Sequence, residues 1–286
     1  MAASTAALYG ITKQYKDFTL GPVDMTVPAG SIVGLIGENG AGKTTLLKIL
    51  CGVNRADDGT VDLLGGSPAD AATRAKIGVV FEDAFFYGSF TAAQVARSLA
   101  GMYGARWNAD SFSAYLRRFG LDAGKKLKEY SRGMRLKLSL AAALAHDPEL
   151  LVLDEATAGL DPVVRGELLD LFLEFIQDER HSIVMSSHIT ADLEQIADSI
   201  AYLHNGQLLF QENKDDLLQE YGVLHCGEDV LPSLPAGLVV FTRRGAYGCE
   251  SLVRERRTVQ ELLPEAVCDA ARLDDIMRFY SGRDAQ

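Results

Sequence analysis

A glycine-rich stretch at residues 37–45, Gly-Glu-Asn-Gly-Ala-Gly-Lys-Thr-Thr, has the spacing of a loop that binds phosphate groups. An apolar run at residues 32–36 precedes it and a helical pattern at residues 44–50 follows it, so the sequence predicts a strand, a loop and a helix. Glycines allow backbone N–H groups to converge on phosphate oxygens, and the helix directs its positive end at the same point. A plain glycine-rich turn before a core helix is the alternative, which the flanking strand and helix disfavour. The expected phosphate-binding residues are Gly37, Asn39, Gly40, Ala41, Gly42, Lys43, Thr44 and Thr45.

Two adjacent carboxylates follow a second apolar run, at residues 150–153. In nucleoside triphosphatases with such a loop, the lysine contacts the β- and γ-phosphates and the threonine hydroxyl binds Mg²⁺. We therefore expect Lys43 and Thr44 to take these positions, and Asp154 to provide a further Mg²⁺ ligand. Glu155 is placed to polarise an attacking water molecule. A helix N-cap is the alternative role for this acidic pair.

The composition is that of an ordinary soluble globular protein. The chain has 286 residues, 48% apolar and 23% charged, with a formal net charge of −11, which argues against a broad basic surface for nucleic acid. No apolar run approaches the ~20 residues that span a bilayer, and the N-terminus lacks the pattern of a signal peptide, so we expect a cytoplasmic protein. The four cysteines have no metal-ligand spacing, and we expect reduced thiols. They are Cys51, Cys226, Cys249 and Cys268.

The order of patterns predicts an α/β fold with an antiparallel β edge, a helical insert and a small C-terminal extension. Short alternating segments within residues 6–30 predict the edge, and helical patterns dominate about residues 88–146. The α/β pattern returns after residue 149 and weakens beyond residue 221. We therefore expect a nucleotide-binding domain at residues 1–221 and an accessory region at residues 222–286.

Local signals place several element boundaries. Thr91 and Gln94 have the spacing of a capping box, and Asp161 followed by proline predicts an N-cap. Asn205-Gly206 predicts a two-residue hairpin turn. We also expect a short helix at residues 123–129, and two or three strands with a terminal helix at about residues 273–280 in the C-terminal region.

Tyr15 lies in the predicted edge, before the phosphate loop. It is a candidate to stack on adenine, and Phe18 is the competing aromatic residue. The alternative is an ordinary edge-strand aromatic.

Taken together, these motifs resemble the ATP-binding subunits of ATP-binding-cassette (ABC) transporters. The loop at residues 37–45, the segment at residues 150–155, the Ala-Gly-Leu-Asp stretch at residues 158–161 and the pair Ser187-His188 follow the family order and spacing. The resemblance covers about residues 6–220. It implies a P-loop core of ABC type, ATP and Mg²⁺ as ligands, and ATP hydrolysis as the activity.

The family also has a signature loop, usually Leu-Ser-Gly-Gly-Gln, which corresponds to residues 130–134 here. Ser131 and Gly133 match the pattern, whereas Tyr130, Arg132 and Met134 depart from it. The serine hydroxyl, the glycine N–H and the start of the following helix still present hydrogen-bond donors to a γ-phosphate. In the family this contact comes from the other subunit, which implies a head-to-tail dimer that holds two ATP molecules. A plain N-cap at Ser131 is the alternative.

The resemblance implies three further roles. His188 matches the switch histidine that contacts the γ-phosphate, and Asp161 matches the loop that couples the two sites of the dimer. Glu82 stands where the family has a glutamine that contacts Mg²⁺. It is therefore an expected Mg²⁺ ligand, although its carboxylate adds a negative charge that the family's amide lacks. Asp83 is the competing candidate for this role.

Six aromatic residues and one methionine, here called the aromatic group, lie close together in the sequence around the first part of the predicted helical insert. Core packing is one interpretation, and a groove that receives a short helix from a membrane subunit is the other. Its members are Phe85, Phe86, Tyr87, Phe90, Met102, Tyr103 and Trp107.

The expected function is ATP-driven export with a separate integral membrane permease, on the inner face of the membrane, and no nucleic acid. Export is inferred because the signature ends in Met, Glu82 replaces glutamine, and the tail at residues 273–280 is similar to that of bacterial drug- and peptide-exporting ATPases. The alternative is a non-transport ABC ATPase of DNA repair, chromosome structure or translation. A subunit that binds ATP without hydrolysing it is disfavoured by Glu155 and His188.

Overall fold

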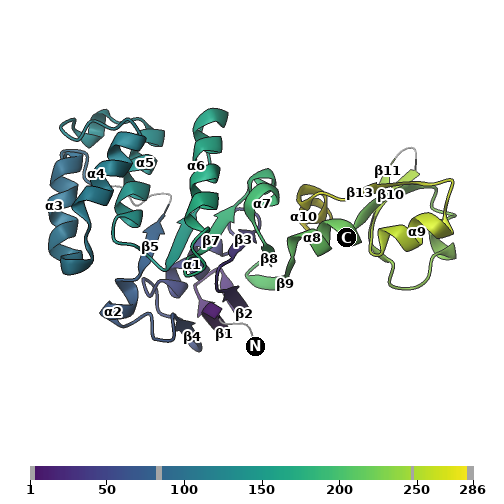
Figure 1. Ribbon diagram of the computed structural model, residues 1–286. Helices are drawn as coiled ribbons and strands as arrows, with labels where there is room; N and C mark the ends of the chain where they lie inside the picture. The colour runs from purple at the N-terminus through teal and green to yellow at the C-terminus, as the bar shows by residue number, and fades with distance from the viewer. Residues whose placement is uncertain (1–3, 82–85, 246–247, 282–286) are drawn as a thin grey trace. The chain divides into compact units, whose positions relative to one another are not determined.

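The computed structural model describes residues 4–81, 86–245 and 248–281. The chain divides into two compact units (Figure 1). Unit 1 consists of residues 1–188 and 201–210, and unit 2 consists of residues 189–200 and 211–286. Among the described residues, no helix is both long enough and apolar enough to cross a membrane.

A six-stranded sheet runs through unit 1 in the order β5-β6-β7-β3-β8-β9. The neighbours β5, β6, β7 and β3 pair in parallel, and every residue of β3, β6 and β7 is buried. Such continuous burial is typical of parallel strands that are covered on both faces. The strands are β3 (Ile32–Ile36), β5 (Ile77–Val80), β6 (Leu150–Asp154), β7 (Ser182–Ser187), β8 (Ser199–His204) and β9 (Gln207–Asn213).

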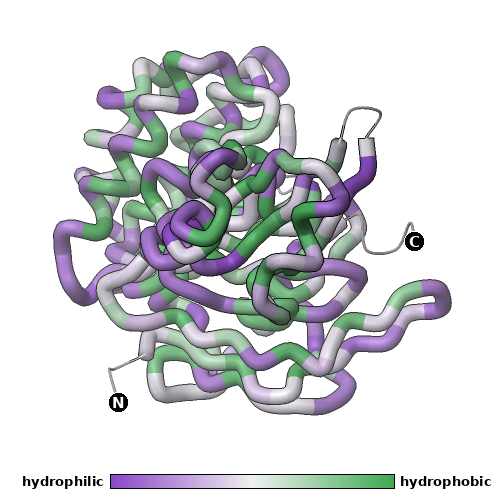
Figure 2. Tube along the Cα trace, turned by 90° about the vertical axis from the view of Figure 1, so that its right-hand side faces the viewer, coloured by the Kyte–Doolittle hydropathy of each residue, from purple (hydrophilic) through white to green (hydrophobic). Residues whose placement is uncertain are grey.

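The predicted antiparallel edge is confirmed as a three-stranded sheet in the order β2-β1-β4. Along β2 the apolar side chains of Leu20, Val23, Met25 and Val27 are buried and form one core with helix α1 (Lys43–Leu50). Figure 2 shows hydrophobic and hydrophilic residues alternating along the strands and helices, as expected for elements with one buried face. The strands are β1 (Ser4–Gln14), β2 (Thr19–Pro28) and β4 (Asp58–Leu63).

Ser182, the first residue of β7, joins the two sheets of unit 1. Its hydroxyl oxygen lies 2.6 Å from the hydroxyl oxygen of Thr5 on β1, and it accepts a hydrogen bond of 3.1 Å from the N–H of Gly30. Gly30 belongs to the turn that leads into β3. Since Ser182 and Thr5 are both buried, these bonds fix the start of the strand that carries the phosphate loop.

The segment between β5 and β6 is helical and has its own core. Thr91 forms the predicted capping box with Gln94. The helix predicted at residues 123–129 is wrong, because only a single 3₁₀ turn forms there. The side chain of Asp122 accepts a hydrogen bond from the N–H of Gly124, which makes a turn instead of a helix start. The elements are α3 (Ala92–Tyr103), η1 (Gly104–Arg106), α4 (Ala109–Arg118), η2 (Leu127–Glu129) and α5 (Arg132–Leu144).

Two further helices connect strands of unit 1. Helix α2 (Ala71–Arg74) lies between β4 and β5, and helix α6 (Pro162–Phe175) lies between β6 and β7. The hairpin between β8 and β9 turns at Asn205 and Gly206, which both have positive φ, at 46° and 79°. This confirms the predicted two-residue turn.

Unit 2 contains a four-stranded antiparallel sheet in the order β11-β12-β10-β13. Beyond residue 221 the sequence predicted two or three strands and only the last helix, because β13 has four residues with a single buried side chain and α9 begins without a capping side chain. The elements are α7 (Thr190–Ile196), α8 (Lys214–Glu220), β10 (Gly222–Cys226), η3 (Leu231–Ser233), β11 (Val239–Gly245), β12 (Gly248–Val253), α9 (Arg256–Leu262), β13 (Val267–Ala270) and α10 (Leu273–Ser281).

The division into units differs from the expected domain boundary at residue 221. Helix α7 groups with the C-terminal part, where the Glu194 side chain accepts a hydrogen bond of 2.8 Å from the N–H of Leu273. The Lys214 side chain donates one of 2.9 Å to the carbonyl oxygen of Glu194. The expectation that residues 222–286 act as a separate accessory region stays a prediction.

The substitution Ser182→Ala is expected to lower the free energy of unfolding by about 1–3 kcal/mol, because it leaves the Thr5 hydroxyl and the Gly30 N–H without their buried partner. Urea unfolding followed by circular dichroism measures this loss. Ser113→Ala on the exposed face of α4 is the matched control, with an expected change within about 0.5 kcal/mol. Equal effects of the two substitutions would contradict the assigned role of Ser182.

Candidate functional site

The loop between β3 and α1 is shaped by close contact with its surroundings. A Cβ atom at Gly37 would lie 2.2 Å from the carbonyl oxygen of Leu203, and one at Gly42 would lie 2.9 Å from the ring of Phe18. Gly42 also has a φ of 107°, in the region that favours glycine. These two glycines are therefore required by the packing of the loop.

The other residues of the predicted loop take different positions. Ala41 is buried, its N–H donates to the carbonyl oxygen of Glu38, and its own carbonyl accepts from Gly206. Asn39 and Gly40 are exposed at the tip, and Thr45 is half-buried in the first turn of α1. The exposed tip leaves the backbone of Asn39 and Gly40 open to a ligand.

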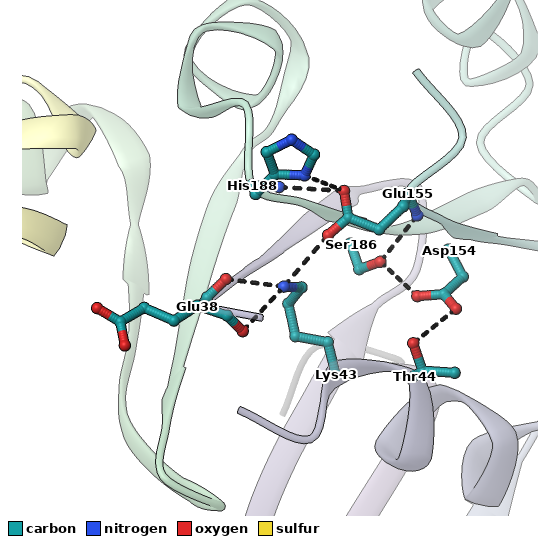
Figure 3. A network of polar contacts seen from close by, with 8 residues as sticks. Glu38, Lys43, Thr44, Asp154, Glu155, Ser186 and His188 are labelled. Atoms are coloured by element: carbon teal, nitrogen blue, oxygen red, sulfur yellow. Dashed lines mark hydrogen bonds and ion pairs between the residues drawn. The ribbon is translucent and has the colours of Figure 1, made fainter. Parts of the chain in front are cut away.

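The Lys43 ammonium group lies inside the loop. It donates to the carbonyl oxygen of Gly37 at 2.7 Å and to that of Glu38 at 3.3 Å (Figure 3). It also forms an ion pair with Glu155, with 3.2 Å between Nζ and Oε1. The Lys43 side chain is only 6% exposed, so its charge is neutralised within the protein by oxygen atoms of this one site.

Asp154 at the end of β6 connects three elements. Its Oδ2 accepts a hydrogen bond of 2.8 Å from the Thr44 hydroxyl on α1, and its Oδ1 accepts one of 2.7 Å from the Ser186 hydroxyl on β7 (Figure 3). Asp154 is 2% exposed, and a buried carboxylate needs such partners. Ser186 was not among the residues predicted from the sequence. The signal for it was a pair of small polar residues at the carboxyl end of a predicted buried strand.

Glu155 lies between two nitrogen groups. Its Oε2 is 2.6 Å from Nδ1 of His188 and accepts a second, longer bond of 3.3 Å from the His188 N–H, while Oε1 is paired with Lys43. Its own N–H donates to the Ser186 hydroxyl at 3.0 Å. Glu155 has a φ of 51°, and such strain in a residue other than glycine is concentrated at functional sites.

His188 follows β7, and its side chain is 49% exposed. Because a carboxylate only accepts hydrogen bonds, its contact with Glu155 assigns the proton to Nδ1. The predicted residues Lys43, Thr44, Asp154, Glu155 and His188 are thus brought together at the carboxyl end of the parallel strands.

Ser131 and Gly133 lie at the start of α5. The Ser131 hydroxyl accepts a hydrogen bond of 3.2 Å from the N–H of Met134, which confirms its N-cap role. Tyr130 is buried and donates to the carbonyl oxygen of Asp122 at 2.7 Å. Tyr130, at the position where the family usually has leucine, therefore packs in the core of the helical segment and bonds to its backbone.

The loop before α6 packs against the start of α5. An added Cβ at Gly159 would lie 3.3 Å from the Arg132 guanidinium, and one at Gly133 would lie 3.6 Å from Leu160. Asp161 is the N-cap of α6 and accepts from the N–H of Val164 at 3.0 Å. Its role in coupling two sites stays a prediction.

Tyr15 is 43% exposed, and the Asn54 side chain donates to its hydroxyl at 3.4 Å. Phe18 instead packs beneath Gly42 as part of the core. Of the two aromatic residues, Tyr15 is the one with a face available for stacking. Glu82 and Asp83 lie outside the described residues, so the predicted contact of Glu82 with Mg²⁺ stays a prediction.

The aromatic group of the helical segment divides into two parts. Phe86, Phe90 and Trp107 pack against its core, and Tyr103 stacks on the buried His146 with 4.1 Å between ring centroids. Burial lowers the pKa of His146. Tyr87 and Met102 are both 78% exposed, and Phe85 lies outside the described residues. The core interpretation holds for the first set, and a docking surface stays a prediction for the exposed pair.

Comparison with known proteins identifies relatives. A sequence profile described as ABC transporter matches residues 20–158. The chain is 36% identical over 212 residues to the bacitracin transport ATP-binding protein BcrA of Enterococcus faecalis, which covers 72% of this chain and 68% of that protein. It is 33% identical over 211 residues to the lantibiotic transport ATP-binding protein SrtF of Streptococcus pyogenes, which covers 73% and 90%.

A third relative is an uncharacterized ABC transporter ATP-binding protein of Synechocystis, 38% identical over 206 residues, which covers 70% of this chain. The chain spans 58% of the length of that relative.

Solved structures share the fold. One described as the ATP-binding subunit of an ABC transporter has a TM-score of 0.68 and 28% identity, and covers 75% of this chain and 92% of that chain. A dimeric ATP-binding cassette bound to ADP and phosphate has a TM-score of 0.66 and 23% identity, and covers 73% and 98%. The site geometry, the profile and the relatives agree, and the chain is a member of the ABC transporter family of ATP-binding proteins.

Proposed function

We propose that this chain is the ATP-hydrolysing subunit of an exporter, which works as a dimer attached to a separate membrane permease. The observation that carries the proposal is the meeting of Lys43, Thr44, Asp154, Glu155 and His188 at one end of the parallel sheet. A phosphate-binding loop, a buried carboxylate and a carboxylate in contact with a histidine are the groups that phosphoryl transfer to water requires.

ATP binds along the loop at residues 37–45. Its phosphates accept hydrogen bonds from the exposed backbone at Asn39 and Gly40, and the Lys43 ammonium turns from the Gly37 carbonyl and Glu155 to the β- and γ-phosphates. Tyr15 stacks on the adenine ring. Binding therefore exchanges contacts that Lys43 already makes within the protein.

The residues present fit a Mg²⁺ ion. The Thr44 hydroxyl and the Asp154 carboxylate are hard oxygen donors 2.8 Å apart, beside the loop. No group of three acidic, histidine or cysteine ligands is found among the described residues, which suits an ion that takes its other ligands from phosphate and water. Thr44 and Asp154 would hold the ion, with Glu82 as a further candidate. The ion neutralises charge on the phosphate oxygens when bound.

Glu155 acts as the general base. As Lys43 turns to the phosphates, Oε1 of Glu155 becomes available to a water molecule, while Oε2 stays on His188. The water oxygen bonds to the γ-phosphorus as the bond from that phosphorus to the β–γ bridging oxygen breaks, and Glu155 takes the proton. His188 holds the carboxylate in position and orients the water.

A second copy of the chain completes the site. Ser131 and Gly133 lie at the N-terminus of α5, where the positive end of the helix dipole reaches the surface of unit 1. In the proposed head-to-tail dimer they cover the γ-phosphate bound by the other copy, so the dimer holds two ATP molecules. Asp161, in the loop packed against the start of α5, couples the two sites.

The export role rests on the relatives named for bacitracin and lantibiotic transport. Closing and reopening of the dimer drives the permease between its conformations. Attachment to the permease places the chain on the cytoplasmic face of the membrane.

The substitution Glu155→Gln is expected to retain ATP binding but to lower hydrolysis at least about 100-fold, because the amide cannot take the proton. In the presence of ATP, the variant then accumulates as the closed dimer. Phosphate release and size-exclusion chromatography with ATP measure the two effects.

Glu149→Gln is the matched control, since Glu149 forms a surface ion pair with Lys76 at 3.1 Å and lies outside the site. Its expected hydrolysis rate is that of the wild type. Hydrolysis near the wild-type rate in Glu155→Gln would overturn the assignment of the base.

Tyr87 and Met102 are the two exposed members of the aromatic group. The double substitution Tyr87→Glu and Met102→Glu is expected to abolish transport, because a charge blocks docking of an apolar helix. Basal ATP hydrolysis is expected to stay within about twofold of the wild-type rate. Transport in vesicles and hydrolysis by the isolated subunit are compared. Tyr9→Glu, at an exposed position of β1, is the control. If transport persists, the pair is not a docking surface.

A further inference from the structure

Two cysteines that are far apart in sequence meet in the sheet of unit 2. Cys226 on β10 and Cys249 on β12 are direct partners in the antiparallel register, and their Sγ atoms are 3.7 Å apart. The Cys249 thiol also lies 3.2 Å from the carbonyl oxygen of Cys226 and donates to it. Directly opposed residues of antiparallel strands have Cα atoms about 4.5–5.5 Å apart, within the range that a disulfide bridges. The strands already hold the two side chains in reach of a covalent bond.

The pair can be reached from solvent. Both cysteines line an open cavity of about 490 Å³, together with Arg244 and with Gly245 and Gly248, the ends of the described strands β11 and β12. Cys226 is half-buried and Cys249 is buried. Arg244 is the partner of Cys249 on β11 and therefore lies on the same face of the sheet. A small reagent that enters this cavity meets Cys226 first.

The other two cysteines offer a contrast within the same chain. Cys51 is buried in the core beneath the phosphate loop, and burial raises the pKa of its thiol to about 12. Cys268 is buried on β13, where its strand partner is Leu224. Within the described part of the chain, the thiol contact is that of Cys226 with Cys249, so Cys51 and Cys268 serve as internal controls.

We propose that Cys226 and Cys249 are a dithiol that is reversibly oxidised to a disulfide, linking β10 to β12 in the C-terminal unit. The oxidant is a low-molecular-weight disulfide of the glutathione class. A metal site is disfavoured, because no group of three metal-ligating side chains occurs among the described residues. The proposal does not depend on the proposed transport function.

The reaction is two successive thiol–disulfide exchanges. Cys226 loses its proton and its sulfur attacks one sulfur of the small disulfide, which forms a mixed disulfide and releases one small thiol. The Cys249 sulfur then attacks Sγ of Cys226, and the second small thiol leaves. The protein loses two protons and two electrons, and the oxidant takes them up to become two thiols.

Oxidation is expected to be slow but favourable. Burial and the contact with Cys249 raise the pKa of the Cys226 thiol to about 11, so little thiolate is present at neutral pH. The second exchange, by contrast, occurs between sulfur atoms that the strands already hold together. Equilibrium measurements therefore test the proposal better than rates.

The test equilibrates the full reduced chain with mixtures of reduced and oxidised glutathione, blocks the remaining thiols by alkylation, and analyses the peptides without reduction by mass spectrometry. We expect a peptide pair that joins Cys226 to Cys249, an intact mass lower by about 2 Da, and full reversal by excess reduced glutathione. Its yield should exceed that of any other cysteine pair by about tenfold or more.

Three variants sharpen the test. Cys51→Ser and Cys268→Ser should leave the cross-link unchanged, and Cys249→Ser should replace it by a mixed disulfide with glutathione at Cys226. The wild-type measurement needs no substitution, so a variant that fails to fold does not affect it. The proposal is overturned if both thiols stay fully alkylatable in excess oxidised glutathione. It is also overturned if each carries a separate glutathione, or if the cross-link forms only in denaturant.

Discussion

Burial of the Asp154 carboxylate at the end of β6 is the constraint on which the site depends. An ionised carboxylate that is 2% exposed costs several kcal/mol unless other groups bond to it, and its two oxygens are bonded by Thr44 and Ser186. These partners come from α1 and β7, so one charge fixes the first turn after the phosphate loop against two parallel strands. The Ser186 hydroxyl also accepts from the N–H of Glu155, which sets the strained backbone that turns this second carboxylate toward Lys43. The loop, the proposed Mg²⁺ ligands and the proposed general base are therefore positioned by one connected set of hydrogen bonds.

Lys43 links this set to nucleotide binding. Its ammonium group is bonded to two loop carbonyls and paired with Glu155, and these contacts keep a nearly buried charge neutralised. In our proposal a bound triphosphate competes with them, and the same exchange makes an oxygen of Glu155 available to water. The proposal thereby couples ATP binding to readiness for hydrolysis through one side chain. Hydrolysis also needs donors from a second copy, so in our proposal the loop of each chain forms only part of a site.

The sequence was informative where function depends on short, local patterns. The phosphate loop, the two carboxylates after a buried strand and the N-cap at Asp161 were predicted, and the N-cap at Ser131 was an alternative, because each is defined by neighbouring residues. Ser186 was missed, since its role appears only when β7 lies beside β6. Tyr130 was seen as a departure from the family, and only its bond to Asp122 explains it. The pairing of Cys226 with Cys249 and the sheet of unit 2 could not be predicted either, because both depend on strand register between short segments with weak patterns.

Completion of each site by the other copy is tested by mixing two variants that are each expected to be inactive. Lys43→Ala removes the phosphate contact, and Gly133→Asp adds a negative charge at the start of α5, where the structure leaves room for the side chain. If the sites are shared head to tail, half of the dimers in an equal mixture contain one copy of each variant, and each of these has one undamaged site. On mixing, ATP hydrolysis is expected to rise from background to about a quarter of the wild-type rate. Hydrolysis that stays at the mean of the two separate variants would contradict sites shared between the copies.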